Sequence, residues 1–198
     1  MTDKTHQALG FAAAAAGYFA TYPNEPLTWG IAGTVVTGAF VGSFLPDIDQ
    51  PTANFWDSVP LGGFVGKLAP RALGGHRNLS HSILGYLLGS ALMYWIATTV
   101  FREGLFDMKL FMLAFELGFF AHLAADAITV QGIPLFWPIG GNMGFPPRPF
   151  HDIRMVTGKW FENLVVFPLS LLFVITILAS HPTEMCALAP GVCRSFGI

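Results

Sequence analysis

The chain of 198 residues has room for one domain of ordinary size; 53% of its residues are hydrophobic and only 11% are charged. Soluble domains carry about 25% charged residues, so this composition excludes a soluble globular protein and predicts an integral membrane protein. The net charge of −2 points to no particular partner. Because the sequence has no basic tract or basic–aromatic patch, we expect no direct contact with nucleic acid.

Five apolar segments approach the length of about 20 residues that a membrane-spanning helix needs. In chain order they cover about residues 9–22, 27–45, 82–101, 110–130 and 161–179. Pro23 and Pro46 end the first two segments, and Ser80 is a candidate N-cap for the third. The sequence therefore predicts an all-α, integral membrane helical bundle with about five transmembrane helices.

The first apolar segment, with its run of alanines, resembles a signal peptide. Its leader carries both Asp3 and Lys4 and so lacks the net positive charge usual in such peptides, and we expect it to be retained. We therefore expect residues 1–180 to form a single membrane-embedded domain, followed by a C-terminal tail, residues 181–198.

Two long connections, about residues 46–80 and 131–160, lie on the same side of the predicted bundle as the N-terminus. That side carries seven Lys and Arg residues against three on the other side, or six against three if Arg77 is set aside as a site residue. By the positive-inside rule it faces the cytoplasm of a bacterial inner membrane, and the tail faces the periplasm. Cys186 and Cys193 would then lie where a disulfide is permitted, so this pair tests the topology.

Side chains that can bind metal ions gather at the cytoplasmic ends of all five predicted helices. They are His6, Asp47, Asp49, His76, His81, His122, Asp126 and Glu162, with Arg77 among them. The helices were assigned from apolar length alone, so this convergence at one depth is a separate signal. A charge at bilayer depth costs a few kcal/mol unless it is paired or ligated, and we therefore predict one common metal site.

The spacing of these residues suits two divalent ions. His122 and Asp126 are four residues apart and share one face of a helix. Asp47 and Asp49, in an extended segment after Pro46, would point to the same side, as a pair that bridges two cations requires. Mixed imidazole and carboxylate ligands favour zinc, with manganese or iron as alternatives. With seven or eight candidate ligands, two ions fit better than one.

Three residues are candidates for catalysis. Two ions about 4 Å apart can activate a bridging water and hold both oxygens of a phosphoryl displacement. Arg77 would hold a phosphate oxygen in a bidentate contact, and Asp49 or Glu162 would act as the base. Other interpretations stay open: solvated side chains at the membrane interface, ion pairs with a structural role, or a proton or ion pathway.

Six features in chain order are His6, Leu45–Pro51 (LPDIDQP), Gly75–Ser82 (GHRNLSHS), His122–Thr129 (HLAADAIT), Gly132–Pro138 (GIPLFWP) and Glu162. Together they resemble the YdjM-like inner-membrane metal-dependent hydrolases, as far as about residue 167. Asn78 and Ser80 depart from the family pattern, which favours glycine and threonine there. The resemblance implies metal-dependent hydrolysis and, because the family's name includes an association with the LexA repressor, suggests a LexA-type repressor as a partner.

The His122–Asp126 pair is also similar, more distantly, to the helical zinc phospholipase C and P1 nuclease enzymes, which cleave phosphate esters at a multi-zinc site. Those enzymes place a histidine four residues before a glutamate. In this sequence Gly158 stands at that position before Glu162.

We therefore hypothesise a membrane-bound, metal-dependent hydrolase that uses a metal-activated water on phosphate esters of lipid or lipid-linked substrates. Two alternatives belong to other classes of protein. One is a metal-stabilised membrane scaffold that binds a partner without catalysis, and the other is a small transporter or ion pathway.

Overall fold

The computed structural model describes residues 1–49, 78–100, 107–147 and 149–195. Five helices form a bundle: α1 (Asp3–Thr21), α2 (Trp29–Phe44), α5 (Ile83–Val100), α6 (Met108–Ala127) and α7 (Phe167–Ser180). Each overlaps one of the five segments predicted from apolar length. Within the described ranges the β contacts are two isolated bridges and no strand is present, so the all-α prediction is confirmed.

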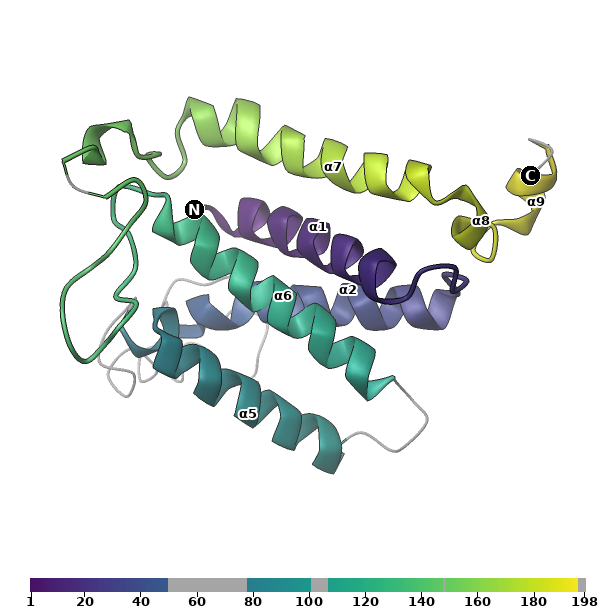
Figure 1. Cartoon of the computed structure of the whole chain (residues 1–198), viewed down its shortest axis with the longest axis horizontal. Helices are drawn as coiled ribbons and strands as arrows, with labels where there is room; N and C mark the ends of the chain where they lie inside the picture. The colour runs from purple at the N-terminus through teal and green to yellow at the C-terminus, as the bar shows by residue number, and fades with distance from the viewer. Residues whose placement is uncertain (50–77, 101–106, 148, 196–198) are drawn as a thin grey trace, which may run out of the picture.

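Short helical turns adjoin the ends of these helices. The 3₁₀ turns η1 (Leu45–Asp49), η2 (Leu79–His81) and η3 (His151–Ile153) and the π-helical turn η4 (Glu162–Val166) lie in or next to the connections. Figure 1 shows the N-terminus, the end of α6 and the start of α7 at one end of the bundle. The C-terminus, with α8 (Pro182–Met185) and α9 (Pro190–Ser195), lies at the other end. The bundle therefore has two distinct ends.

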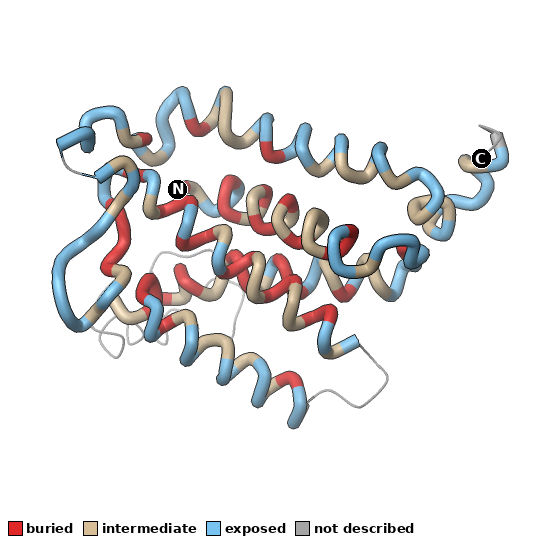
Figure 2. Tube along the Cα trace, in the orientation of Figure 1, coloured by how far each residue is buried: buried red, intermediate tan, exposed pale blue. Residues whose placement is uncertain are grey.

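Three segments among the described residues are long and apolar enough to cross a membrane. They are Trp29–Asp49, Met108–Ala127 and Glu162–Ser180, and the apolar helix over Ile83–Thr99 is shorter. The segment Glu162–Ser180 is exposed along most of its length, as Figure 2 shows, which suits a helix surrounded by lipid. These spans confirm a helical membrane protein, whereas the count of five spans stays a prediction.

Helices α2 and α6 pack closely because glycines line their contact. A Cβ atom on Gly42 would collide with the carbonyl oxygen of Phe115, and one on Gly118 would lie 2.6 Å from the carbonyl oxygen of Ala39. Gly38 and Gly42 are four residues apart, the small-xxx-small spacing that lets membrane helices approach each other. The pair α2–α6 is therefore the centre of the bundle.

The start of α5 differs from the sequence prediction. The Oγ of Ser82, not of Ser80, accepts the N–H of Gly85 at 3.0 Å and caps the helix. The reason is the 3₁₀ turn η2, which takes up the residues just before Ser82 and delays the start of the α-helix to Ile83. The hydroxyl of Ser80 is thereby left for contacts with other side chains.

The C-terminal tail packs back onto the bundle at the end opposite the N-terminus. Cys186 and Cys193 form a disulfide, and the carbonyl of Glu184 accepts the N–H of Leu27 at 3.0 Å. The ring of His181 stacks on Phe19 with centroids 4.0 Å apart. The tail and the connection before α2 therefore lie together.

The close approach of α2 and α6 predicts a large cost for Gly42→Ala. The added methyl group would meet the Phe115 backbone, which cannot rotate away, so we expect a loss of at least about 1–3 kcal/mol of stability. Gly33→Ala on the same helix is the control, because its Cβ would meet no described atom within 4 Å. Unfolding in detergent measures both, and equal stability of the two variants would contradict this packing.

The topology inferred from the positive charges predicts that the disulfide lies outside the cytoplasm. We expect a thiol reagent to label Cys186 and Cys193 only after reduction, and an impermeant reagent to reach them in reduced spheroplasts. As the comparison, His151→Cys in a variant without the two native cysteines should be protected, because it lies at the other end of the bundle on an exposed turn. Labelling of that cysteine from outside would show that the inferred topology is wrong.

Candidate metal centre

Helix α6 supplies two donors of the predicted site on one face, as the four-residue spacing indicates. The side chains of His122 and Asp126 are both fully buried. The Nδ1–H of His122 donates to the backbone carbonyl of Ser43 at 2.6 Å, if the tautomer is assigned from this contact. Its Nε2 is then an acceptor, and it lies 3.3 Å from Nε2 of His81 and 3.7 Å from Oδ1 of Asp47.

The carboxylate of Asp126 lies between two histidines from different parts of the chain. Its Oδ1 is 3.2 Å from Nε2 of His6, and its Oδ2 is 3.4 Å from Nε2 of His81. The amino group of Met1 also contacts Oδ1. The predicted convergence of α1, η2 and α6 at one point is therefore present in the structure.

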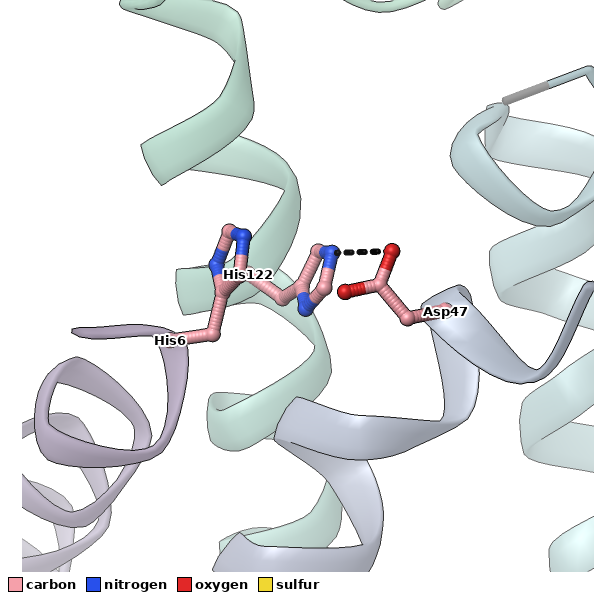
Figure 3. A group of neighbouring side chains, drawn as sticks. All are labelled: His6, Asp47 and His122. Atoms are coloured by element: carbon pink, nitrogen blue, oxygen red, sulfur yellow. Dashed lines mark ion pairs between the residues drawn. The ribbon is translucent and has the colours of Figure 1, made fainter. Parts of the chain in front are cut away.

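Two groups of three donors emerge, and they share His122. One group is His6, Asp47 and His122, and the other is His81, His122 and Asp126; within each group the donor atoms lie within 4.8 Å of one another. Figure 3 shows His6 and Asp47 on either side of His122. The imidazoles and carboxylates come from α1, η1, η2 and α6, and these distances permit each group to hold a cation.

A hydroxyl relay orients the second histidine of the site. The Oγ–H of Ser80 donates to Oδ2 of Asp49 at 2.6 Å, and its oxygen lies 2.9 Å from Nδ1 of His81. Because Ser80 has one proton and gives it to Asp49, His81 is the donor in the second contact and carries its proton on Nδ1. Its Nε2 is then an acceptor that points at Nε2 of His122.

Two acceptor nitrogens 3.3 Å apart repel each other unless a proton or a metal ion lies between them. A tetrahedral zinc ion with Zn–N bonds of about 2.0–2.1 Å holds its ligands about 3.3 Å apart. The observed separation of the Nε2 atoms of His81 and His122 is therefore the separation that a shared ion produces. The tautomers that their Nδ1 partners impose are also those that metal-binding histidines adopt.

The ring of His6 gives a second indication that the site suits a cation. Both of its nitrogens are buried and form no hydrogen bond with any described residue; the contact of Nε2 with Asp126 lacks hydrogen-bond geometry. The ring stacks on His122 with centroids 3.6 Å apart and is 1% exposed. Leaving a buried polar atom without a partner costs roughly 1–3 kcal/mol, which a coordinated ion would remove.

The extended segment predicted for Asp47 and Asp49 is wrong. These residues lie in the 3₁₀ turn η1, not in an extended segment, and residues two apart in such a turn point about 120° from each other. Asp47 faces His81 and His122, whereas Asp49 faces Ser80. Asp47 therefore belongs to a donor group, and Asp49 orients His81 through the hydroxyl of Ser80.

Glu162 lies beside the donor groups and outside both of them. Its Oε1 accepts the N–H and the hydroxyl of Thr2 at 2.7 and 2.6 Å, and its Oε2 accepts the N–H of Gly158 at 2.7 Å. Gly158 has a φ of 74°, which suits a residue without a Cβ. Glu162 thus connects η4 to the start of α1, on a π-helical turn of the kind frequent at functional sites.

The remaining predicted residues, His76 and Arg77, lie outside the described residues. The structure adds Ser43, Ser80 and Thr2, which the sequence reasoning missed. Ser80 had a signal, because it directly precedes His81. The roles of Ser43 and Thr2 had none, since a backbone carbonyl and an isolated threonine carry no pattern.

The hydroxyl relay predicts that Ser80→Ala weakens metal binding without removing a ligand. Loss of an outer-shell partner of a ligating histidine typically costs 10–100-fold in metal affinity, and we expect a loss in this range. Ser90→Ala is the control, because the Ser90 hydroxyl donates to Glu116 on the apolar part of α6. Titration of metal-free protein with zinc measures the affinity of both variants. Unchanged zinc affinity in Ser80→Ala would contradict the role of the relay.

Comparison with known proteins gives a consistent result. A protein YvsG of Bacillus subtilis is 30% identical over 172 residues, which is 86% of this chain and 91% of YvsG. The inner membrane proteins YdjM of Escherichia coli and Shigella flexneri are each 32% identical over 112 residues, 57% of this chain. The aligned part covers 53% of each YdjM protein. No solved structure matches the chain.

The model of the YdjM inner membrane protein family matches residues 1–187. The match includes all four elements that supply the donors and the glutamate on η4. The chain therefore belongs to the YdjM inner membrane protein family.

Proposed function

We propose that this protein is a membrane-bound, metal-dependent hydrolase that cleaves phosphate esters of lipid or lipid-linked substrates. The observation that carries the proposal is the pair of acceptor nitrogens on His81 and His122, which face each other among two buried carboxylates. Imidazole and carboxylate donors in this mixture suit zinc, with manganese or iron as alternatives. The two overlapping donor groups favour two ions.

The donor set supports hydrolysis rather than electron transfer. A divalent cation held there would polarise a phosphoryl oxygen and activate a coordinated water for attack. Asp47, Asp126, His6, His81 and His122 would hold the ions. In the reaction a water oxygen bonds to phosphorus, the P–O bond to the lipid alcohol breaks, and the water's proton passes to the leaving oxygen.

Two carboxylates near the donor groups are candidates to move that proton. Asp49 reaches the site through Ser80 and His81. Glu162 lies next to it through Thr2, whose neighbour Met1 contacts Asp126. Both carboxylates are fully buried, so their hydrogen bonds fix their positions relative to the ions.

The position of the site supports a lipid substrate. The donors lie at or next to the ends of apolar helices, and the ends of membrane-spanning helices lie where hydrocarbon gives way to polar head groups. The excess of Lys and Arg on the same side supports a site that faces the cytoplasm of the inner membrane. The disulfide at the opposite end agrees with this orientation.

Metal content and phosphate release from purified protein test the proposal. With phosphatidic acid in mixed micelles as the first substrate and other lipid phosphoesters after it, we expect turnover that a chelator abolishes and zinc or manganese restores. His122→Ala and Asp47→Ala should each lose metal and at least about 100-fold in rate, as removal of a ligand predicts. His151→Ala is the control, because His151 is exposed and pairs with Asp152.

Full metal content in both His122→Ala and Asp47→Ala would show that the ligands are assigned wrongly. If the wild-type protein binds metal but releases no phosphate from any lipid phosphoester, the proposed hydrolase activity is wrong. The metal site itself would then stand without that activity.

A second function, a metal-stabilised scaffold, has an observation in its favour. Catalytic metal sites keep an open coordination position, whereas His81, His122 and Asp126 are fully buried. A structural ion would raise the unfolding temperature without supporting turnover. The third alternative, an ion pathway, would instead appear as cation or proton flux into liposomes that contain metal-free protein.

A further inference from the structure

A groove runs along the membrane face of the bundle between α1, α6 and α7, and we call it the α1–α6–α7 groove. Its volume is about 730 Å³, within the roughly 300–1,000 Å³ of ligand sites. One wall consists of alanines, among them Ala13 of α1 and Ala121 and Ala124 of α6. The other wall is bulky and includes Leu169 and Phe173 of α7. The groove is thus a long apolar slot with one smooth side.

The elements that line the groove also carry residues of the metal centre. Leu9 lies three residues after His6 on α1, and Ala125 directly precedes Asp126 on α6. On the third side, Val165 lies three residues after Glu162. Each element that lines the groove therefore carries a polar residue of the site within about one turn of a lining residue, which puts one end of the groove near the metal centre.

The surroundings of the groove identify what can fill it. The segments Met108–Ala127 and Glu162–Ser180, which form two of its walls, are long and apolar enough to cross the bilayer. Phe120, at its edge, is 63% exposed and would face lipid. A slot between such helices opens into hydrocarbon, where acyl chains take the place of water. A cation held by His6 and Asp126, which lie close to the lining residues along the chain, would attract an anionic head group.

Two other cavities fit an acyl chain of the substrate less well. One, of about 580 Å³ beside α5, is lined partly by Ile133, Leu135 and Met143 in the non-helical connection after α6. Exposed irregular backbone does not occur in hydrocarbon, so this cavity lies toward the interface. The other, of about 340 Å³, has less than half the volume of the groove, and it runs from Ala8 toward Tyr18 and Leu188 at the opposite end of the bundle.

We propose that the α1–α6–α7 groove holds an acyl chain of the lipid substrate, so that the phosphate ester enters the metal centre sideways from the membrane. This inference rests on the proposed hydrolase function and narrows its substrates to phosphate esters that carry a long acyl chain. The head group lies near His6 and Asp126, and the chain extends past Ala13 and Phe173.

A substitution that fills the groove tests the inference. Ala13→Phe places a ring in the slot, and Ala121→Phe does so from the facing helix. Ala15→Phe is the control, because Ala15 lies on the same helix and lines a different cavity, the one of about 340 Å³. The probes are phosphatidic acid with a diazirine in its acyl chain, in phosphatidylcholine vesicles, and dihexanoyl phosphatidic acid in solution.

We expect Ala13→Phe and Ala121→Phe to lower crosslinking and kcat/KM for long-chain phosphatidic acid at least tenfold. Metal content and kcat/KM for the dihexanoyl substrate should stay within about twofold of wild type, and Ala15→Phe should change none of these. Retained metal also shows that the filled variants have folded. In the wild type, the crosslinks should map to the α7 residues Leu169 and Phe173.

Equal crosslinking in Ala13→Phe and wild type would overturn the proposal that the groove holds the acyl chain. Crosslinks confined to Leu87 and Met143, which line the cavity beside α5, would also overturn it. Equal losses with both substrates would also overturn it, because the site itself would then be damaged. If wild type hydrolyses neither substrate, the hydrolase function fails. Crosslinking that maps to α7 and is lost in the two filled variants would still support the groove as a lipid site.

Discussion

The close approach of α2 to α6 is the constraint on which the site depends. Gly42 and Gly118 remove the side chains that would hold the two helices apart. As a result the carbonyl of Ser43, at the end of α2, reaches Nδ1 of His122, and Asp47 in the following turn lies beside the same ring. The donors must meet within a few ångströms, so a small separation of the helices would remove the site.

The second constraint is electrostatic. Nδ1 of His122 is bound by a carbonyl and Nδ1 of His81 by a serine hydroxyl that is itself bound by Asp49. Both rings therefore present acceptors to a space that also contains the carboxylates of Asp47 and Asp126. Such a concentration of acceptors in a buried place favours the folded state only with a positive charge among them, so a metal ion bound there would stabilise the fold.

The sequence allowed the helices to be predicted because apolar length is a strong signal in membrane proteins. It also predicted that His6, His81, His122 and Asp126 converge, since each follows or precedes an apolar segment on one side. The 3₁₀ turn that separates Asp47 from Asp49 was not predictable, because Pro46 is compatible with both extended and helical backbone. The partners of Ser80 and Glu162 were also beyond prediction, because Asp49 and Thr2 lie 31 and 160 residues away along the chain.

The contact between Thr2 and Glu162 joins the first helix of the bundle to the last, and this has a consequence for biosynthesis. At roughly 5–20 residues per second, the ribosome delivers Glu162 on the order of 10–30 s after His6. Until then the start of α1 lacks its partner from η4. All five donors precede Glu162 in the chain, so a nascent chain arrested before that residue would carry the complete donor set without the contact that joins the start of α1 to η4.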